Sequence, residues 1–403
     1  MTPLRFLMVC MQYPAGPGQS YMTTELADAL VSAGHQVEVL FLDWNDATGG
    51  NATKETMSSG VRVVRCAAHE LGGLGGIVRA ASKFVLSGRR AARAARDHFD
   101  LTSFDAAIAW MPASAIARLV RLFRCAGIRH RLLFIWDFFP FHHREIGLIP
   151  AGLPFVIARA LEQRLLSRFS TIICSMPANG DYLRRHYRIA PDQNVLISPI
   201  WSSRRTLPPV DRAAVRARHG LPAEVPIAVF GGQFVEGRGF EQMLDAAEGA
   251  MIAGSPLLYL FVGDGRLAPV LKGQASRRSN VRILDPLPRD SYLELLGACD
   301  AGMAATVPGV SSFSFPSKIM DYLAACLPVI LAVEDGNGMK DLLDRYRVGA
   351  VVPFGDAHLF QREAHRFATD QGLREAARMG APRCLDEVFD VRHIVGRLVD
   401  ACA

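Results

Sequence analysis

The chain has 403 residues, of which 50% are hydrophobic and 21% are charged, so it can bury sizeable cores and is not an extensively disordered protein. Its net charge of +6 is mild, and no Lys/Arg-rich run with interleaved aromatic residues occurs, which argues against nucleic-acid binding. Residues 1–200 hold 22 Lys and Arg against 15 Asp and Glu, whereas residues 201–403 hold 23 against 24. The basic first half suggests an anionic partner or surface; an Arg-rich composition without any partner is the alternative.

Cysteine and histidine spacing gives no sign of disulfides or of a metal site. The eight cysteines lie far apart without a C-x-x-C pair, which is typical of buried, reduced thiols. His142 and His143 are adjacent and cannot share one face of a helix, and no Asp-x-Asp pair occurs, so we expect neither metal nor cofactor. No apolar stretch reaches the roughly 20 residues of a membrane span. The apolar run over residues 6–11 is too short for a signal peptide, so we expect a soluble, cytoplasmic protein.

Short apolar strands alternate with amphipathic helices along the chain, which predicts parallel sheets covered on both faces. In the first half, the pattern predicts a helix over residues 21–33, ended by Gly34, and strands over residues 4–11, 36–42, 106–110, 131–136, 171–174 and 195–200. The Arg-rich segments 89–96 and 118–131 fit exposed helix faces between these strands.

The polar, Pro-rich stretch 201–209 interrupts this alternation and predicts a linker. Beyond it, the pattern predicts helices over residues 240–249, 292–298 and 317–325 and strands over residues 226–230, 257–262, 281–284, 301–304 and 329–333. We therefore expect an α/β fold of two doubly wound, Rossmann-like domains facing a cleft, one formed by residues 1–200 and the other by residues 201–384. In such sheets ligands bind at the carboxyl ends of the strands.

The segment before the last predicted strand has the features of a phosphate site. Ser314 can cap a helix, and Pro316 suits its first turn because the missing N–H would be unpaired there. The free amides of that turn, the helix dipole and Lys318 would together hold an anion. Asp321 lies four residues after Ser317 on one helix face, where it could accept from ribose hydroxyls. The alternative is an ordinary capped helix with a surface aspartate.

Glycine-rich loops follow three predicted strands. Residues 229–240 run from a strand through glycines to Arg238 at a helix entrance, where its guanidinium could bind a phosphate. Gly263-Asp264-Gly265 follows the next strand in the same way, although such glycines often only make a turn. After the first strand, Gly16 and Gly18 depart from the G-x-G-x-x-G spacing, which disfavours a dinucleotide site.

A charged and aromatic segment follows the strand predicted over residues 131–136. Asp137 and His142 lie there among aromatic residues, which favours the edge of a cleft. They are candidates for handling a proton or orienting a hydroxyl, and a structural role for both is the alternative.

These motifs resemble a GT-B glycosyltransferase, specifically the retaining family-4 or group 1 glycosyltransferases, over most of the chain. Residues 26–30 and 33–39 resemble the start of the family's acceptor domain, and Ser198-Pro199-Ile200-Trp201 resembles its Pro-Asn-Trp stretch. Gly263-Asp264-Gly265, residues 280–284 and Pro316-Ser317-Lys318 match the donor domain in order and spacing. The Pro-Ser-Lys form is similar to that of enzymes building bacterial surface polysaccharides. The resemblance also implies that residues 385–403 form a helix crossing back to the first domain.

The resemblance implies roles for individual positions. Arg238 stands where the family has its diphosphate-binding lysine, and Ser317 and Lys318 look like diphosphate ligands. Asp321 occupies the second acidic position of the family's E-x(7)-E motif and looks like the ribose ligand. The full expected donor-binding set is Gly16, Gly18, Gly232, Gln233, Arg238, Gly263, Arg282, Ile283, Ser314, Phe315, Pro316, Ser317, Lys318 and Asp321, and the expected catalytic residues are Asp137, His142, Arg238 and Lys318.

Three positions depart from the family pattern. Gln233 replaces the arginine that usually accompanies the diphosphate-binding lysine, and Phe313 replaces the first acidic residue of the motif. Trp136 stands where the family has a histidine, next to Asp137. Within the resemblance, Gly16 and Gly18 form the loop that approaches the transferred sugar, and the backbone near Arg282 and Ile283 forms the wall against the base.

The resemblance implies a metal-independent enzyme that moves a sugar from a UDP- or GDP-linked donor to a glycan or lipid-diphosphate-linked acceptor, with retention of configuration. It would act in bacterial surface polysaccharide synthesis, in the cytoplasm, with peripheral contact of the basic first domain at the inner membrane face. A sugar-nucleotide epimerase of the same architecture and a catalytically decayed sugar-nucleotide-binding subunit are the alternatives. A nicotinamide-dependent oxidoreductase is less consistent with the motifs.

Overall fold

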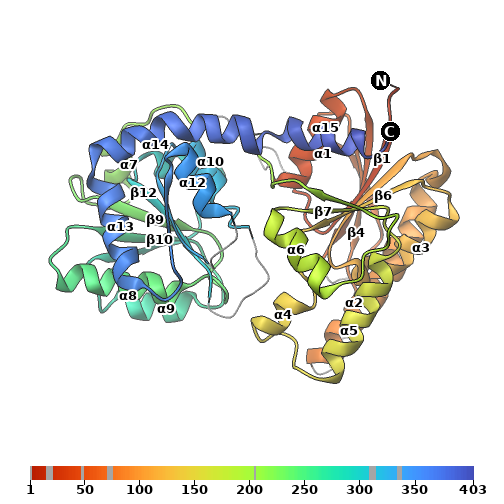
Figure 1. The fold of residues 1–403 in the computed structure, drawn as a ribbon, viewed down its shortest axis with the longest axis horizontal. Helices are drawn as coiled ribbons and strands as arrows, with labels where there is room; N and C mark the ends of the chain where they lie inside the picture. Colours follow the sequence, from red (N-terminus) through yellow and green to blue (C-terminus); the bar gives the residue numbers. More distant parts are fainter. Residues whose placement is uncertain are drawn as a thin grey trace. The chain divides into compact units, whose positions relative to one another are not determined.

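The computed structural model describes residues 2–14, 21–46, 50–69, 76–203, 206–307, 315–333 and 338–403, and it divides into two compact units. Unit 1 comprises Met1–Trp201 and Val391–Ala403, and unit 2 comprises Ser202–Asp390 (Figure 1). The first division lies inside the expected linker. The chain rejoins unit 1 at Val391, later than the expected position 385, because the preceding residues pack within unit 2.

Unit 1 is built on an eight-stranded sheet with the order β3-β4-β2-β1-β5-β6-β7-β8. All neighbouring strands pair in parallel except β3, which runs antiparallel to β4. The strands are β1 (Arg5–Cys10), β2 (Gln36–Asp43), β3 (Thr53–Thr56), β4 (Arg62–Ala67), β5 (Ala106–Trp110), β6 (His130–Ile135), β7 (Thr171–Cys174) and β8 (Asn194–Ile197).

Helices cover both faces of this sheet, because the apolar side chains of each buried strand point alternately to one face and to the other. On β1, Phe6 and Met8 pack toward α1 (Met22–Ser32) and the C-terminal α15 (Val391–Asp400), whereas Leu7 and Val9 face the opposite core. That opposite core includes side chains of α2 (Gly76–His98), α3 (Ala117–Cys125), α5 (Leu153–Leu166) and α6 (Pro177–His186). Three shorter helices complete the unit: η1 (Leu101–Ser103), η2 (Ala113–Ile116) and α4 (Phe141–Glu145).

The expected helical stretch over residues 118–131 is shorter in the structure. Helix α3 ends at Cys125, and Gly127 adopts a positive φ of 77° that ends the helix. Arg131 lies on β6 instead, where its guanidinium donates to the carbonyl oxygen of Arg168 at 2.7 Å.

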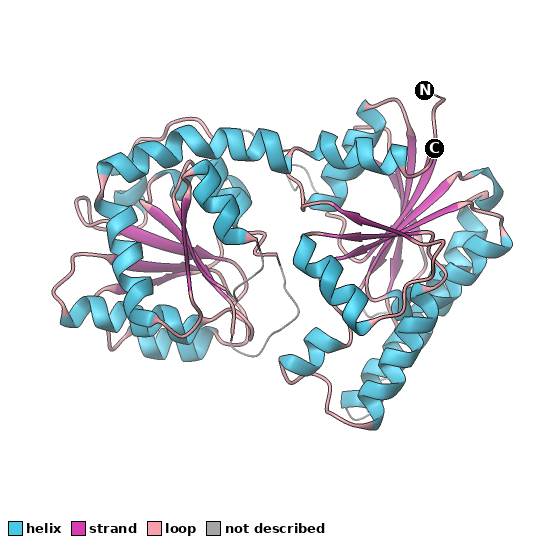
Figure 2. Cartoon of the chain, in the orientation of Figure 1, coloured by secondary structure: helices cyan, strands magenta, loops and turns pink. Residues whose placement is uncertain are grey.

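Unit 2 is built on a six-stranded parallel sheet with the order β11-β10-β9-β12-β13-β14 (Figure 2). The chain moves outward from β9 through β10 to β11, then returns to the other side of β9 for β12. The carboxyl ends of β9 and β12 therefore flank the point where the winding reverses, at which ligands bind in such sheets. The strands are β9 (Ile227–Gly231), β10 (Leu258–Val262), β11 (Val281–Leu284), β12 (Ala301–Ala305), β13 (Val329–Ala332) and β14 (Gly349–Val352).

The helices of unit 2 also lie on both faces of the sheet. Helices α8 (Phe240–Ile252), α9 (Ala268–Ala275) and α13 (Ala357–Thr369) share one apolar core with the strands. Helix α11 (Ile319–Ala324) contacts β12 and β13 on the other face, with α10 (Arg289–Gly297) and α14 (Gln371–Cys384) packed against it. Helices α7 (Arg212–Arg218) and α12 (Met339–Tyr346) and the π-helical turn η3 (Leu385–Phe389) complete the unit. Among the described residues of both units, no helix is long and apolar enough to cross a membrane.

Candidate functional site

Two glycine loops lock together at the carboxyl ends of β9 and β10. The backbone amide of Gly232 donates to the carbonyl oxygen of Val262 at 2.9 Å, and that of Phe234 donates to the backbone carbonyl oxygen of Asp264 at 2.8 Å. Gly232 and Gly263 have φ angles of 140° and 150°, which side chains rarely permit. A Cβ atom at Gly263 would also overlap the carbonyl oxygen of Gly232. Glycine is therefore required for the close approach of the two loops, which leaves backbone without side chains at the carboxyl end of the sheet.

Lys318 reaches across the end of β9 from the segment before α11. Its Nζ lies 4.9 Å from the ring centre of Phe230, and a Cβ atom at Gly232 would come within 2.8 Å of its Cε. Burial and, to a smaller extent, the positive charge of Arg238 lower the pKa of Lys318 to about 7, against the opposing effect of Asp321. The ammonium is thus held where its own positive charge is poorly stabilised.

Arg238 supplies the second cation and lies in the loop between β9 and α8. Its Nε is buried without a hydrogen-bond partner, and among the described residues it forms no ion pair. Gly239 follows with a φ of 59°, which turns the backbone into α8. The nearby carboxylate of Asp321 is already bound by Arg289, so an anion from outside the chain would stabilise these two neighbouring cations.

Asp321 is already engaged by Arg289. The two form an ion pair in which Arg289 Nη1 donates to Oδ2 at 3.0 Å and Nη2 donates to Oδ1. Burial raises the pKa of Asp321, while the adjacent Arg289 and Lys318 oppose that rise. The sequence interpretation missed Arg289, which is the first residue of α10, directly after Pro288. The ribose role expected for Asp321 stays a prediction, and a ribose hydroxyl would have to share the carboxylate with Arg289.

The expected helix over residues 317–325 begins later than predicted. Helix α11 starts at Ile319 with Lys318 at its N-cap, so Pro316 and Ser317 precede the helix. The amide of Ile319 donates to the carbonyl oxygen of Pro316, and the amide of Met320 donates to that of Ser317. Each bond spans three residues, which defines a tight turn of the 3₁₀ type. The expectation that Pro316 lies in the first helical turn is therefore wrong. Ser317 is exposed at this turn.

Two tyrosines pack near the reversal point: Tyr322, which is fully buried, and Tyr292, which is half-buried. The hydroxyl of Tyr322 donates to Met303 on β12 at 3.2 Å and accepts the amide proton of Gly231 on β9 at 3.2 Å. A Cβ atom at Gly231 would overlap the hydroxyl of Tyr292, so this glycine makes room for the second ring. Tyr322 thus joins the ends of β9 and β12 through its hydroxyl. The sequence pattern did not identify it.

The other residues expected to bind the sugar-nucleotide donor lie in different environments. Gln233 is exposed in the β9 loop, Arg282 is exposed on β11, and Ile283 packs half-buried against the core of unit 2. Phe315 makes an edge-to-face contact with Phe389, with ring centres 5.7 Å apart. Gly16, Gly18 and Ser314, together with Phe313, lie outside the described residues.

In unit 1, the carboxyl ends of the central strands carry an aromatic cluster. The ring of Trp136, after β6, lies 5.7 Å from Trp110, 5.8 Å from Trp201 and 6.4 Å from Tyr21. Trp201 Nε1 donates to Met22 at 2.7 Å, whereas Trp110 Nε1 is buried without a partner. Trp136 itself is half-buried, so part of this aromatic surface reaches solvent.

Asp137 lies beside this cluster and is exposed. Burial raises the pKa of Tyr21 to about 12, and the charge of Asp137 contributes to the rise. Burial lowers the pKa of His143, with a smaller lowering by His142 and an opposing effect of Asp137. The structure thus brings Asp137 near Tyr21 and His143, whereas His142, the expected partner, is half-buried on α4. His143, whose Nδ1 is buried without a hydrogen-bond partner, was missed because adjacent histidines cannot be told apart from sequence alone.

Family comparison agrees with this arrangement. Residues 18–200 match the model of the glycosyl transferase 4-like domain, and residues 211–383 match that of the glycosyl transferases group 1. Two Rossmann-like units of these types define a glycosyltransferase of the GT-B class. The chain belongs to the group 1 glycosyltransferases.

The curated relatives are distant. The D-inositol 3-phosphate glycosyltransferase of Streptomyces bingchenggensis is 25% identical over 251 residues, which cover 59% of this chain and 54% of the relative. A protein of Pseudomonas aeruginosa named probable glycosyltransferase WbjE is 26% identical over 121 residues, or 30% of each chain. The chain thus spans about half the length of the first relative and less of the second.

Solved structures share the fold over nearly the whole length. Sucrose-phosphate synthase from Thermosynechococcus elongatus matches with a TM-score of 0.73 at 15% identity, covering 98% of each chain. WaaG, a glycosyltransferase involved in lipopolysaccharide biosynthesis, matches with a TM-score of 0.69 at 14% identity, covering 99% of each chain. Anabaena HepE, solved in complex with UDP and glucose, matches with a TM-score of 0.68 at 15% identity, covering 98% of each chain. At these identities the likeness concerns the fold alone.

Proposed function

We propose that unit 2 binds a UDP- or GDP-linked sugar, with the diphosphate between Arg238 and Lys318 at the carboxyl end of β9. The observation that carries the proposal is the convergence of these two cations beside the bare backbone of Gly232, where the nearby Asp321 carboxylate is already bound by Arg289. A diphosphate would supply the missing negative charge. It also favours the charged form of Lys318, whose pKa is depressed in the free protein.

The proposed reaction breaks the bond between the anomeric carbon and the diphosphate oxygen and forms a bond to an acceptor hydroxyl, with retention. Negative charge builds up on the departing diphosphate, so Arg238 and Lys318 stabilise the transition state more than the ground state. The acceptor hydroxyl loses its proton in this step, and Asp137 and His142 remain our candidates for orienting it or handling that proton.

For the acceptor, we propose a glycan or a lipid-diphosphate-linked oligosaccharide bound by unit 1, in bacterial surface polysaccharide synthesis in the cytoplasm. The net positive charge of residues 1–200 and the half-exposed Trp136 support such an acceptor, because sugars pack on aromatic rings and diphosphates attract arginine. The likeness in fold to WaaG, a glycosyltransferase involved in lipopolysaccharide biosynthesis, is consistent with this class.

We also propose that the transfer needs no metal ion, because two cationic side chains already face the diphosphate position. Within the described ranges, no group of three or more His, Cys, Asp and Glu side chains could hold a metal. Transfer in the presence of EDTA tests this directly, and an absolute requirement for added magnesium or manganese would contradict it.

The donor site is tested with Lys318→Gln and Arg238→Gln in the full chain, using UDP-glucose and GDP-mannose as calorimetric probes. Losing one charged hydrogen bond to a diphosphate weakens binding by about 10- to 100-fold. Lys340→Gln and Arg277→Gln remove exposed cations of unit 2 away from β9 and should leave affinity unchanged. Equal affinity of all four variants would place the donor elsewhere. Anomeric NMR of the product tests retention.

A further inference from the structure

Unit 2 has a cavity at the opposite end of its sheet from the glycine loops. The cavity has a volume of about 410 Å³ and is lined by Pro226, just before β9, by Asp300, just before β12, and by residues of α7 and α14. Strands rise about 3.3 Å per residue, so the five residues of β9 separate the cavity from Gly232 by roughly 15 Å. The cavity is therefore separate from the proposed diphosphate position.

One carboxylate at this cavity, that of Asp300, is shared by three guanidinium groups. It accepts from Nη2 of Arg212 at 2.6 Å, from Nη2 of Arg216 at 2.7 Å and from Nη1 of Arg374 at 3.0 Å. Asp300 is 4% exposed and also accepts the amide proton of Ile227. Three positive charges against one negative charge leave these four side chains with a net charge of +2.

The three arginines differ in how far the chain satisfies them. Arg216 is buried and donates through Nε, Nη1 and Nη2, so it stabilises the fold. Arg212 donates to two backbone carbonyl oxygens besides Asp300. Among the described residues, Arg374 makes only its bond to Asp300, and its Nε is buried without a partner. The side chain of Arg374 is 40% exposed as a whole, so a solute can reach this unsatisfied group.

The rest of the lining is small and carries one further charge. Three alanines, Pro226 and Thr369 form walls of the cavity, and the hydroxyl of Thr369 already donates to the backbone of His365. Glu224 is the other acid in the lining and is exposed. The volume is within the range of about 300–1,000 Å³ that is typical of small-molecule sites, and it exceeds the space that a phosphate ion alone would fill.

We propose that this cavity binds a small phosphate monoester of the size of a hexose phosphate, with its phosphate group on Arg374 and Arg212. Guanidinium groups bind phosphate oxygens in a bidentate geometry, and a phosphate monoester carries a charge of about −1.5 to −2 near pH 7, which matches the excess charge. The small walls leave room for the uncharged part of the ligand. The inference goes beyond the proposed function, since it requires neither donor binding nor transfer.

The test is calorimetry of the full chain with glucose 6-phosphate, inorganic phosphate and glucose as probes. Glucose 6-phosphate should bind, inorganic phosphate should bind more weakly and glucose should not bind, and added salt should weaken the binding of both anions. Arg374→Gln should weaken glucose 6-phosphate binding by about 10- to 100-fold, the effect of one charged hydrogen bond. Arg374→Lys keeps the charge but not the bidentate geometry, so its affinity should lie in between.

A variant of opposite sign is available at Glu224. Glu224→Gln removes a negative charge from the lining and should strengthen glucose 6-phosphate binding by about two- to fivefold. Because Glu224 is exposed, this variant should fold normally. Its effect therefore tests the proposal even if Arg374→Gln lowers the melting temperature.

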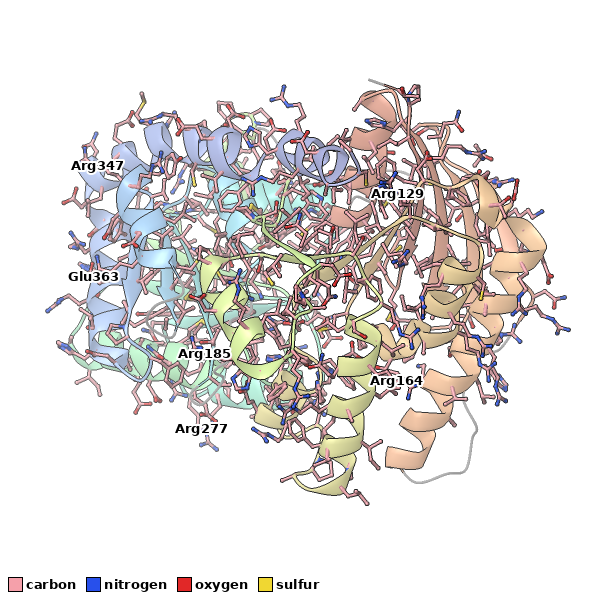
Figure 3. All side chains as sticks on the ribbon, turned by 45° about the vertical axis from the view of Figure 1, so that its right-hand side comes forward. Arg129, Arg164, Arg185, Arg277, Arg347 and Glu363 are labelled. Carbon is pink, nitrogen blue, oxygen red and sulfur yellow. The ribbon has the colours of Figure 1, made fainter. Side chains whose placement is uncertain are left out.

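Controls in unit 2 separate this cavity from the donor site. Lys318→Gln should leave glucose 6-phosphate binding unchanged while it weakens UDP-glucose binding, and Arg374→Gln should do the reverse. Arg277, whose side chain is directed outward in Figure 3, is an exposed arginine outside the cavity, and Arg277→Gln should alter neither affinity.

Absence of glucose 6-phosphate binding to the wild type would overturn the proposal. Binding that Lys318→Gln abolishes and Arg374→Gln leaves intact would also overturn it, because the phosphate would then lie at the donor site. Equal affinity for inorganic phosphate and glucose 6-phosphate would overturn the assignment to a phosphate ester.

Discussion

The depressed pKa of Lys318 makes donor binding dependent on pH. With a pKa of about 7, this side chain is mostly neutral at pH 8 in the free protein, because only about one tenth of it is charged there. A diphosphate between Lys318 and Arg238 favours the charged form and returns the pKa toward its ordinary value of 10.5. Donor binding at pH 8 must therefore draw a proton from solution.

The expected uptake is about 0.9 proton per sugar nucleotide bound at pH 8, and affinity should fall by about tenfold per pH unit above 7. Calorimetry of UDP-glucose or GDP-mannose in HEPES and Tris, which differ in ionisation enthalpy, measures the uptake from the difference in apparent heat. Sugar nucleotides are suitable probes because their diphosphate has no group that titrates between pH 7 and pH 8.5.

The control is Lys318→Gln, which should bind more weakly and take up almost no proton, while Lys340→Gln should behave as wild type. Binding with no proton uptake and no pH dependence in the wild type would refute the idea that Lys318 faces the diphosphate. The same uptake in Lys318→Gln would assign the titration to another group.

Three further predictions concern residues that support the two units. Gly263→Ala should weaken UDP-glucose binding and lower the melting temperature, since it collides with the Gly232 carbonyl. Gly273→Ala, in a helix with open space around it, should be neutral or stabilising by up to about 1 kcal/mol in thermal unfolding. Asp300→Asn should reduce the free energy of unfolding by about 3 kcal/mol in a denaturant titration, because it leaves the buried Arg216 guanidinium without its carboxylate. A change of less than about 0.5 kcal/mol would be inconsistent with a stabilising ion pair between Asp300 and Arg216. Burial raises the pKa of Glu162 to about 7, so the stability that its protonated form contributes is present at low pH and is lost as pH rises from 4.5 through 7. Relative to Glu162→Gln, the free energy of unfolding of the wild type should fall by about 2 kcal/mol between pH 5 and pH 7.5. A difference between the two proteins that stays constant over this range would contradict the prediction.

Buried parallel strands were the most predictable part of the fold. The predicted ranges for β5 and β7 coincide with the observed bounds, because such strands are short apolar runs between turns. The range predicted for the partly exposed edge strand β11 coincides as well, whereas β4 and β14 were not predicted. Strand β3 was not predicted, since its sequence Thr-Lys-Glu-Thr is fully exposed and polar. Its backbone is extended because it pairs antiparallel with β4, and such pairing cannot be recognised from the hydrophobicity of the strand's own residues.

The candidate site was predictable where topology places consecutive loops together. Gly232 and Gly263 follow neighbouring parallel strands, so their approach follows from the strand order alone. Arg289 could not be foreseen as the partner of Asp321, since 32 positions separate them and only the packing of α10 against α11 joins them. The start of α11 was also misplaced. Capping rules would begin the helix near Pro316, whereas the observed hydrogen bonds form a tight turn there first.

Several features at this end of unit 2 favour a bound anion independently of any likeness to other proteins. Gly232 and Gly263 adopt backbone conformations that other residues resist, Lys318 is held with a depressed pKa, and Arg238 has a buried Nε without a partner. Each of these features destabilises the free chain, and none improves the packing of the core. They lie at the reversal point of the sheet, on loops that come from different parts of the sequence. One bound anion would compensate the charge features together and would use the space that the glycines leave open, which would explain why these unfavourable features occur at one place.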